Sequence, residues 1–359
     1  MTQSITKTAK VLLVLIAVLL AIFHLYTAYF GTFPGLIQRS IHWGGVLVAI
    51  FLLPLTKLDQ LSRGRKILII ISSVVLVVLS AVTSLYLVID YEDILVRIGS
   101  FTSIDIVLGV IAVILLLEAT RRSLGWALLI ITILFILYAF LGPYIPGMAG
   151  HGGITFERFF STMYLTSNGI YGIALGVAAT FIYLFIFFAS ILNQRGAGNF
   201  FVNLAVSATG RVSGGPALSA VMGSALMGTI SGSGVANVAT TGTFTIPLIK
   251  KTGYKPHFAG AVEAVASNGG QILPPVMGAA VFLMAEILGI PYLTIAIAAL
   301  IPAILYFITI GFVVYLQAKK ENISTLDKDE VPSFKKTMKN GFFYLIPLIV
   351  IVFFSSSRI

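Results

Sequence analysis

Long runs of hydrophobic residues, separated by short polar loops, dominate the first half of the chain. Six of these runs cover residues 11–30, 41–55, 67–88, 104–117, 124–141 and 170–192. A transmembrane helix needs about 20 mostly apolar residues, because the hydrocarbon core of a bilayer is about 30 Å thick. The pattern therefore predicts six membrane-spanning helices. Residues 154–165 predict a short interfacial helix, since Thr155 can cap its N-terminus and Arg158 can face lipid headgroups.

The second half contains two apolar segments that small polar residues interrupt midway. The first, residues 214–249, is broken by a Gly/Ser stretch at residues 229–234, and the second, residues 257–287, is broken at residues 267–271. In lipid, irregular backbone persists only where protein buries it or where it lines a cavity. Discontinuous helices near the membrane midplane are where transporters bind ions and substrates. The pattern is therefore typical of a secondary transporter.

The charges at the ends of the first broken segment predict how it enters the membrane. Arg211 precedes it and Lys250 and Lys251 follow it, so both ends are expected on the cytoplasmic side. Its two arms, residues 216–228 and 235–247, would each form about 20 Å of helix, which is shorter than the hydrocarbon core. We therefore predict a re-entrant helical hairpin whose tip reaches the midplane. The alternative is two ordinary spans joined by a tight turn.

Composition supports an integral membrane protein and excludes a soluble domain. Of the 359 residues, 58% are hydrophobic and only 10% are charged, and the mean hydropathy is +1.02. The net charge of +10 comes mostly from Lys and Arg in loops on one predicted side, with only Arg39, Arg97 and Arg158 among the first six spans falling outside. This bias places the N-terminus in the cytoplasm and gives no reason to expect nucleic-acid binding. The absence of Cys and the four scattered His argue against transition-metal sites. No phosphate-binding loop or catalytic constellation is present, so we expect no enzyme.

The hairpin tip offers oxygen atoms suited to a hard monovalent cation. Ser231 and Ser233 supply hydroxyls, and Gly232 and Gly234 allow close approach of the backbone. Carbonyls at the end of the first arm could face a cation, and amides at the start of the second could face an anion. Such ligands without a carboxylate suit Na⁺ better than a divalent metal. The alternative is that these small residues only permit close helix packing.

Further polar residues follow the tip and occupy the second break. Asn237, Thr240 and Thr241 have helical spacing and could line the same cavity, while the second break offers Ser267, Asn268, Gln271 and the bare backbone of Gly269 and Gly270, with Pro274 and Pro275 after them. A kinked span with bound waters is the alternative for this break. Glu263 is the one carboxylate deep in an apolar run; it could relay protons or pair with a cation, but we favour an interfacial position near Lys255 and Lys251.

Four sequence motifs together resemble one family. They are GTISGSGVANV at 228–238, EAVASNGGQILPPVMGAA at 263–280, LEATRR at 117–122 and KKTGY at 250–254. The chain resembles the tripartite ATP-independent periplasmic (TRAP) transporters, and most closely the fused permease of the TAXI type. The resemblance implies an inner-membrane, Na⁺-driven importer of organic acids such as C4-dicarboxylates. A periplasmic solute-binding protein would deliver the substrate, and an elevator movement would carry it across the bilayer.

The resemblance also implies roles for the residues of the two breaks. The expected sodium-binding residues are Ser231, Gly232, Ser233, Gly234, Asn237, Ser267 and Gly269. The expected substrate-binding residues are Thr240, Thr241, Asn268, Gly270, Gln271 and Pro274. Na⁺ is the coupling ion, and no other cofactor is expected.

The expected fold is an all-α polytopic helical bundle with a re-entrant hairpin and a broken helix, the first half of an inverted-repeat transporter. Residues 1–100 would correspond to the small subunit and residues 101–318 to the first repeat of the large subunit. A cytoplasmic linker, 319–340, would lead to the start of a second repeat at 341–359. We expect the rest of that repeat to be missing, so that a second chain supplies it. The alternatives are a non-transporting membrane scaffold and one half of a split permease.

Overall fold

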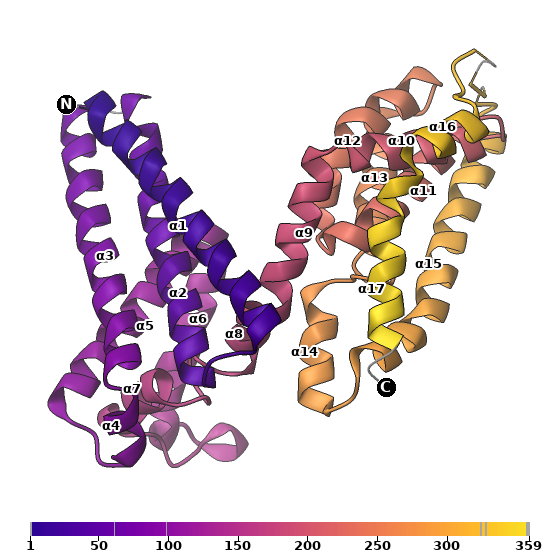
Figure 1. Ribbon diagram of the computed structural model, residues 1–359. Helices are drawn as coiled ribbons and strands as arrows, with labels where there is room; N and C mark the ends of the chain where they lie inside the picture. Colours follow the sequence, from indigo (N-terminus) through magenta and orange to yellow (C-terminus); the bar gives the residue numbers. More distant parts are fainter. Residues whose placement is uncertain (1, 61, 98, 324, 327–328, 357–359) are drawn as a thin grey trace. The chain divides into compact units, whose positions relative to one another are not determined.

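The computed structural model describes residues 2–60, 62–97, 99–323, 325–326 and 329–356. Every regular element in this part of the chain is helical, which confirms the predicted all-α class (Figure 1). Seven of the described helical segments are long and apolar enough to cross a membrane: Gln3–Phe30, Gly35–Leu58, Arg63–Ile89, Ser103–Leu124, Trp126–Tyr144, Ile173–Gln194 and Tyr292–Lys320. The chain divides into two compact units, Met1–Thr180 and Phe181–Ile359.

The first unit is built from helices joined by short turns. Its α-helices are α1 (Thr2–Phe30), α2 (Gly35–Leu52), α3 (Arg63–Ile89), α4 (Tyr91–Val96), α5 (Ser103–Leu124), α6 (Trp126–Leu141), α7 (Phe156–Leu165) and α8 (Ile173–Val177). Short 3₁₀ segments cover Leu53–Gln60, Gly142–Tyr144 and Gly147–Ala149, and a π-helical turn, Ala178–Ile182, leads into the second unit. Large side chains such as Phe51, Leu87 and Tyr164 are fully buried between these helices.

The helices of the first unit extend beyond the apolar runs that predict them. Helix α1 begins at Thr2 and α2 at Gly35, whereas the runs begin at residues 11 and 41. The hydropathy pattern marks the part of a helix that lies in lipid, and polar residues can continue the same helix into the interface. The expected interfacial helix is α7, and the Thr155 hydroxyl accepts a hydrogen bond from the Arg158 amide at 3.3 Å, as predicted for a cap.

A buried carboxylate anchors the start of α5. Asp105 is fully buried and forms a capping box with Thr102: its Oδ2 accepts from the Thr102 amide at 2.8 Å, and its own amide donates to the Thr102 hydroxyl at 3.3 Å. The other carboxylate oxygen accepts from the Tyr86 hydroxyl at 2.7 Å and from Arg97 at 3.2 Å. These bonds join α3, the loop after α4 and α5 at one end of the unit.

The second unit contains the hairpin and the broken helix. Its elements are α9 (Tyr183–Gln194), α10 (Ala197–Thr209), α11 (Gly215–Ser231), α12 (Gly234–Lys251), α13 (Pro256–Gly269), α14 (Ala279–Leu288), α15 (Tyr292–Lys320), α16 (Phe334–Gly341), a 3₁₀ turn (Phe342–Tyr344) and α17 (Ile346–Ser356). Helices α11 and α12 form the hairpin, and α13 and α14 are the halves of the broken helix. Small residues such as Ala217, Ala220 and Ala266 are fully buried where these helices meet α15, because they let helix backbones approach closely.

Three features of this unit differ from the sequence prediction. The hairpin arms have 17 and 18 residues rather than 13, since Ser231 still continues α11 and Pro247 lies inside α12 without ending it. Helix α10 occupies a stretch that the hydropathy pattern leaves without an element. Helix α16 overlaps the end of the expected linker, 319–340, and its three lysines among eight residues hid its short apolar face from the sequence pattern. The division of the unit at residues 318–340 into a repeat and a linker stays a prediction.

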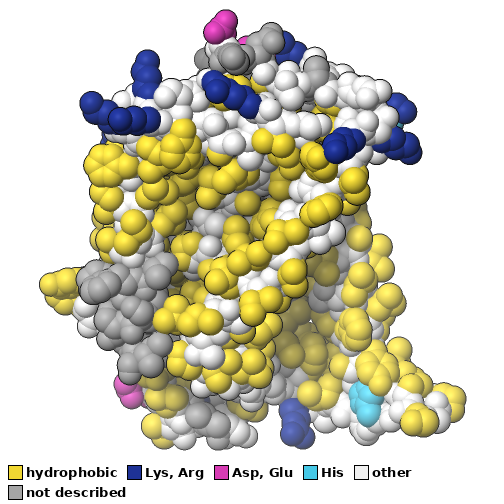
Figure 2. All heavy atoms as spheres, turned by 90° about the vertical axis from the view of Figure 1, so that its right-hand side faces the viewer, with side chains coloured by type: hydrophobic (Ala, Val, Ile, Leu, Met, Phe, Trp, Pro, Cys, Tyr) yellow, Lys and Arg dark blue, Asp and Glu magenta, His cyan; other side chains and the backbone are white. Residues whose placement is uncertain are grey.

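The ends of several helices in the second unit share a basic surface. Lys251 forms an ion pair with Glu330, and Lys255 lies 3.8 Å from Glu321, so the turn between α12 and α13 meets the segment that follows α15. The amide of Leu326 donates to the Gly210 carbonyl at 3.4 Å, which brings the turn before α11 to the same end. Figure 2 shows Lys and Arg gathered at one end of the face that it presents, above a broad hydrophobic surface. Both ends of the hairpin therefore lie on one side of the unit.

Candidate functional site: the hairpin tip and the helix break

A two-residue turn forms the tip of the hairpin. Gly232 has a φ of +59°, in the left-handed region that glycine tolerates, and its amide donates to the Gly228 carbonyl at 3.1 Å. Ser233 is extended and caps α12, with its hydroxyl accepting from the Ala236 amide at 3.3 Å. The Gly/Ser stretch thus ends one helix and begins the next within two residues, as its composition predicts.

The second break is a nine-residue loop, residues 270–278, between α13 and α14. It starts as a continuation of the helical turn, with the Gln271 amide donating to the Asn268 carbonyl at 3.1 Å. It closes on itself where the Gly278 amide donates to the Gln271 carbonyl at 2.7 Å. Pro274 and Pro275 lie within this loop and remove two backbone donors.

The tip and the break contact each other directly. The Val276 amide donates to the Thr229 carbonyl at 3.1 Å. A Cβ placed on Gly228 would collide with the Cα of Gly270, so two backbones meet here and glycine is required at both positions. A Cβ placed on Gly234 would meet the side chains of Asn268 and Gln271, with the Gln271 Nε2 at 2.7 Å. The structure brings together two motifs that lie about 40 residues apart in the sequence.

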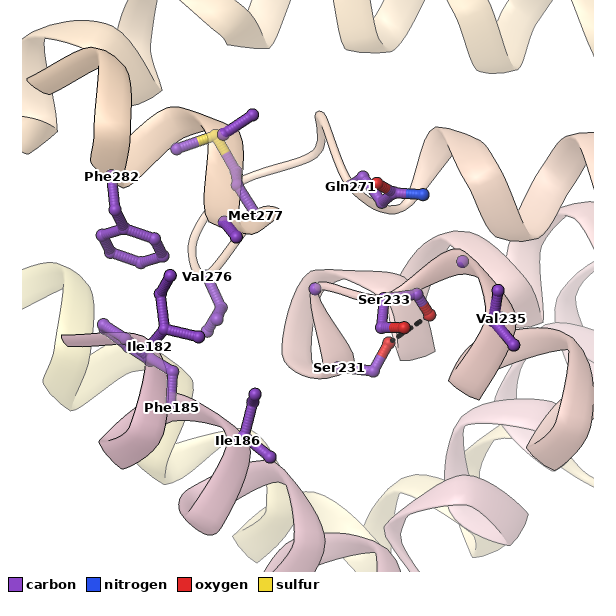
Figure 3. Close-up of a pocket in the computed structure, with 14 residues that line it drawn as sticks. Ile182, Phe185, Ile186, Ser231, Ser233, Val235, Gln271, Val276, Met277 and Phe282 are labelled. Carbon is purple, nitrogen blue, oxygen red and sulfur yellow. Dashed lines mark hydrogen bonds between the residues drawn. The ribbon is translucent and has the colours of Figure 1, made fainter. Parts of the chain in front are cut away.

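A cavity of about 360 Å³ opens beside this contact. Figure 3 shows Ser231, Ser233 and Gln271 on one side of it and apolar side chains of α9, the loop and α14 on the other. The lining residues are Ile182, Phe185, Ile186, Ser231, Gly232, Ser233, Gly234, Val235, Gln271, Val276, Met277, Ala279, Ala280 and Phe282. None of these residues is charged. The polar part of the wall consists of hydroxyl, amide and backbone groups.

Four helix ends converge on this region. The carbonyl-bearing C-terminal ends of α11 and α13 and the amide-bearing N-terminal ends of α12 and α14 all lie at the tip or in the adjoining loop. Helix termini leave unpaired backbone groups and carry partial charges, which are negative at the C-terminal end and positive at the N-terminal end. The arrangement can therefore offer carbonyls to a cation and amides to an anionic group without any charged side chain.

The sequence-predicted site residues do not all line this cavity. Thr240 and Thr241 line a separate cavity of about 220 Å³ between α10 and α12. Pro274 lines an apolar cavity of about 150 Å³ next to α15. Gly269 packs against the ring of Tyr306, and Asn268 is exposed and accepts a hydrogen bond from Gln271 at 3.0 Å. The roles assigned to these residues stay predictions, and only the tip residues and Gln271 share one wall.

A second polar cluster is buried between α11, α12 and α13. At its centre is Glu263, which is fully buried. Its Oε1 accepts from Ser224 at 3.0 Å, from Ser267 at 3.0 Å and from Thr241, and its Oε2 accepts from Thr245 at 2.6 Å. Lys251 and Lys255 pair with Glu330 and Glu321, while Glu263 lies inside the protein among hydroxyls; its position near the membrane interface stays a prediction. Thr245 follows Thr241 by one helical turn, so the sequence could have indicated that both face the same cluster. The contact of Ser224 with the Glu263 carboxylate depends on helix packing and has no such sequence signal.

Asn237 belongs to the same region. Its side-chain amide nitrogen donates to the Ser224 backbone carbonyl at 2.8 Å, and its backbone carbonyl accepts from the Thr241 hydroxyl at 2.8 Å. The side chain is fully buried, yet its Oδ1 has no hydrogen-bond partner among the described residues. Ser267, expected at a sodium site, bonds Glu263 directly, whereas Asn237, also expected there, contacts Ser224 and Thr241; neither lines the tip cavity.

These features define an integral membrane protein with the hairpin and broken helix typical of secondary transporters. Residues 111–358 match the family model of the tripartite ATP-independent periplasmic transporter, DctM component. The chain therefore belongs to the TRAP transporter large permease family, as its motifs predict. This family consists of transporter permeases.

Curated relatives agree with this assignment. The chain is 27% identical over 173 residues to a putative TRAP transporter large permease protein of Haemophilus influenzae. The matched stretch covers 48% of this chain and 40% of the relative. The chain is 22% identical over 168 residues to the C4-dicarboxylate TRAP transporter large permease protein DctM of Pseudomonas aeruginosa, covering 47% and 39%. A stretch of 74 residues is 39% identical to the isethionate TRAP transporter permease protein DctMQ of Oleidesulfovibrio alaskensis, covering 21% and 12%. The chain thus spans less than half the length of these relatives.

Proposed function

We propose that this chain forms the ion- and substrate-binding hairpin module of a Na⁺-coupled importer of organic acids. The observation that carries the proposal is the convergence of the hairpin tip and the helix break at one cavity. Irregular backbone persists in a membrane only where protein buries it or where it lines a cavity, and here two irregular segments contact each other. Both contribute helix ends and neutral side-chain oxygens to the same place. Such a place suits a desolvated ion and a small anion bound side by side.

Na⁺ is the ion that best fits the tip. The groups there are hydroxyl and carbonyl oxygens from Ser231, Gly232 and Ser233, with no carboxylate among the lining residues. Hard oxygen ligands exclude soft metals, and the lack of negative charge disfavours divalent ions. An organic acid would place its carboxylate near the amides at the start of α12, where the helix dipole favours negative charge. The apolar side chains of Phe185 and Phe282 would face its carbon skeleton.

The division of the chain into two compact units supports an elevator movement. All residues of the tip, the break and the buried Glu263 cluster belong to the second unit, Phe181–Ile359. A unit that holds all of these residues can carry them through the membrane as one body. A periplasmic solute-binding protein would deliver the organic acid, and further permease segments would complete the substrate site. The membrane concerned would be the inner membrane, with the N-terminus in the cytoplasm.

Sodium-dependent uptake into proteoliposomes tests this function. A complete permease that carries these residues is supplied with its binding protein, an organic acid and a Na⁺ gradient. Ser233→Leu should abolish uptake, because it fills the tip and removes the α12 cap. Thr243→Leu is the matched control, since Thr243 is exposed on the same helix and its hydroxyl donates to the Thr240 carbonyl one turn earlier. Unchanged, sodium-dependent uptake by Ser233→Leu would exclude the tip from the mechanism.

A further inference from the structure

A polar cavity lies between α10 and α16, away from the tip. Its volume is about 530 Å³, which is in the range of sites that hold small molecules. Its polar lining includes Asn203 of α10, Lys336, Thr337 and Asn340 of α16, and Tyr344 of the turn that follows. None of these five residues lines the tip cavity. A ligand bound here is therefore independent of the proposed sodium coupling.

Packing of α16 against α10 builds the walls of this cavity. Met338 and Tyr344 pack against a buried cluster that contains Phe200 of α10. Gly341 is buried, and a Cβ added to it would collide with the Phe200 ring, so α16 ends in close contact with α10. The Tyr344 hydroxyl donates to the Arg195 carbonyl and thereby joins the turn after α16 to the turn before α10. These contacts hold the walls in place without using the polar side chains that line the cavity.

The polar side chains of the cavity have unused hydrogen-bond donors. The side chains of Asn203, Lys336, Thr337 and Asn340 make no hydrogen bond or ion pair with any described residue. An ammonium group has three N–H donors, each Asn amide has two, and a hydroxyl has one. No carboxylate is among the described residues that line the cavity. A positive charge surrounded by neutral donors fits the oxygen atoms of a phosphodiester, which accept charge-assisted hydrogen bonds.

Further positive charge surrounds the cavity. Lys335 and Lys339 are exposed on α16, and Arg195 is exposed in the turn before α10. None of these three residues, nor Lys336, forms an ion pair with a described residue. The sequences of α10, α16 and the turn after α16 contain no Asp or Glu that could neutralise them. The surroundings of the cavity therefore attract anions and disfavour cations.

An exposed apolar surface adjoins the basic cavity. Phe334 at the start of α16 and Phe342 and Phe343 after its end are exposed, as are Ile346 and Ile349 on α17. Figure 1 shows α16 beside α10 at one end of the second unit and α17 running away from that end. Basic residues above an apolar surface are typical of a segment at the membrane interface. A molecule bound here would meet positive charge and donors at one end and apolar side chains at the other.

We propose that the cavity between α10 and α16 binds the headgroup of an anionic phospholipid. Its phosphodiester lies at Lys336, where Asn203 and Asn340 donate to the phosphate oxygens, and its acyl chains run along Phe343 and α17. Basic pockets at the membrane surface bind anionic headgroups in this way. A zwitterionic lipid is disfavoured, because its ammonium group would add positive charge to a basic site. The bound lipid fastens the segment between α15 and α17 to α10 at the membrane surface.

Lipid binding by the purified chain tests this site. The chain is delipidated in a neutral detergent and titrated with dioleoyl phosphatidylglycerol or dioleoyl phosphatidylcholine at physiological ionic strength, and native mass spectrometry counts the lipids that stay bound. Phosphatidylglycerol should bind more tightly than phosphatidylcholine. Lys336→Gln should raise the half-saturating phosphatidylglycerol concentration of the site at least about tenfold, as expected for a lost hydrogen bond between charged groups. Asn203→Leu, which is similar in size and keeps every charge, should also weaken phosphatidylglycerol binding.

Lys335→Gln is the matched control, because it removes the same charge from the neighbouring exposed residue, which does not line the cavity. Exposed charges are largely screened at this ionic strength, so Lys335→Gln should change the half-saturating concentration less than about twofold. Gel filtration and the melting temperature without lipid show whether each variant folds like the wild type. Equal weakening by the two lysine variants would overturn the proposal, as would equal binding of the two lipids. Displacement of phosphatidylglycerol by equimolar inorganic phosphate would also overturn it, because the site would then bind a free anion.

Discussion

The close contact between Gly228 and Gly270 makes the docking of the hairpin on the broken helix measurable. A Cβ on Gly228 would collide with the Gly270 Cα and would lie 3.3 Å from its carbonyl carbon, and a Cβ on Gly270 would in turn collide with the Gly228 Cα. Both obstacles are backbone atoms, which no rotamer change can remove. Gly228→Ala therefore has to push α11 away from the loop that begins at residue 270.

The size of the effect follows from two opposing terms. Adding a methyl group to a tightly packed interior costs about 1–3 kcal/mol of unfolding free energy. Alanine in place of glycine inside a helix raises the unfolding free energy by about 1 kcal/mol. Gly260 lies inside α13, and a methyl group added there would have no neighbouring atom within 4 Å. Gly260→Ala should therefore gain the helix-propensity stabilisation without any packing cost. The two variants should differ by about 1–3 kcal/mol, which is about 2–12 °C in melting temperature for a unit of this size.

Thermal unfolding in detergent, followed by circular dichroism and by gel filtration after heating, measures this difference. Gly228→Ala should melt well below Gly260→Ala, and Gly270→Ala should behave like Gly228→Ala. The double variant should cost less than the sum of the two, because both methyl groups relieve the same contact by the same displacement. If Gly228→Ala is as stable as Gly260→Ala, the tip does not rest on the break, and the shared site is refuted.

Three further predictions concern topology and the first unit. Arg211→Cys and Lys250→Cys in this cysteine-free chain should both react with an impermeant thiol reagent from the cytoplasmic side, and periplasmic labelling of either would contradict the hairpin. Asp105→Asn should lower the unfolding free energy by about 2–3 kcal/mol, as expected for lost hydrogen bonds to a charged group. Asp93→Asn, at an exposed residue, should leave the unfolding free energy unchanged. Equal changes of unfolding free energy in the two variants would refute the anchoring role of Asp105. Thr155→Ala should cost about 0.5–2 kcal/mol through loss of the α7 cap, and Thr155→Ser should restore most of it. No difference between the two Thr155 variants in the midpoint of chemical unfolding would contradict the cap.

Hydropathy and glycine chemistry made much of the fold predictable from the sequence. The apolar runs predicted the spans that form α1, α2, α3, α5, α6 and the stretch from α8 to α9, since the thickness of a bilayer imposes a length that is visible in one dimension. The Gly/Ser stretches predicted where α11 gives way to α12 and where α13 ends, because few other residues end a helix inside a membrane. Helix α10 was missed since its mixed face packs against protein, and packing leaves no simple hydropathy signal.

Which polar residues meet depends on helix packing rather than on local sequence. The sequence alone indicated that Ser231, Ser233 and Gln271 would lie at breaks, and the local geometry of helix ends supports that. It did not indicate that Ser224 and Thr245 contact Glu263, because those contacts depend on how three helices rotate about their axes. A rotation of one residue, about 100°, moves a side chain from a buried seam to the lipid face without changing hydropathy. Packing of small residues along α11, α12 and α13 sets that rotation, and with it places the carboxylate among hydroxyls instead of beside the lysines.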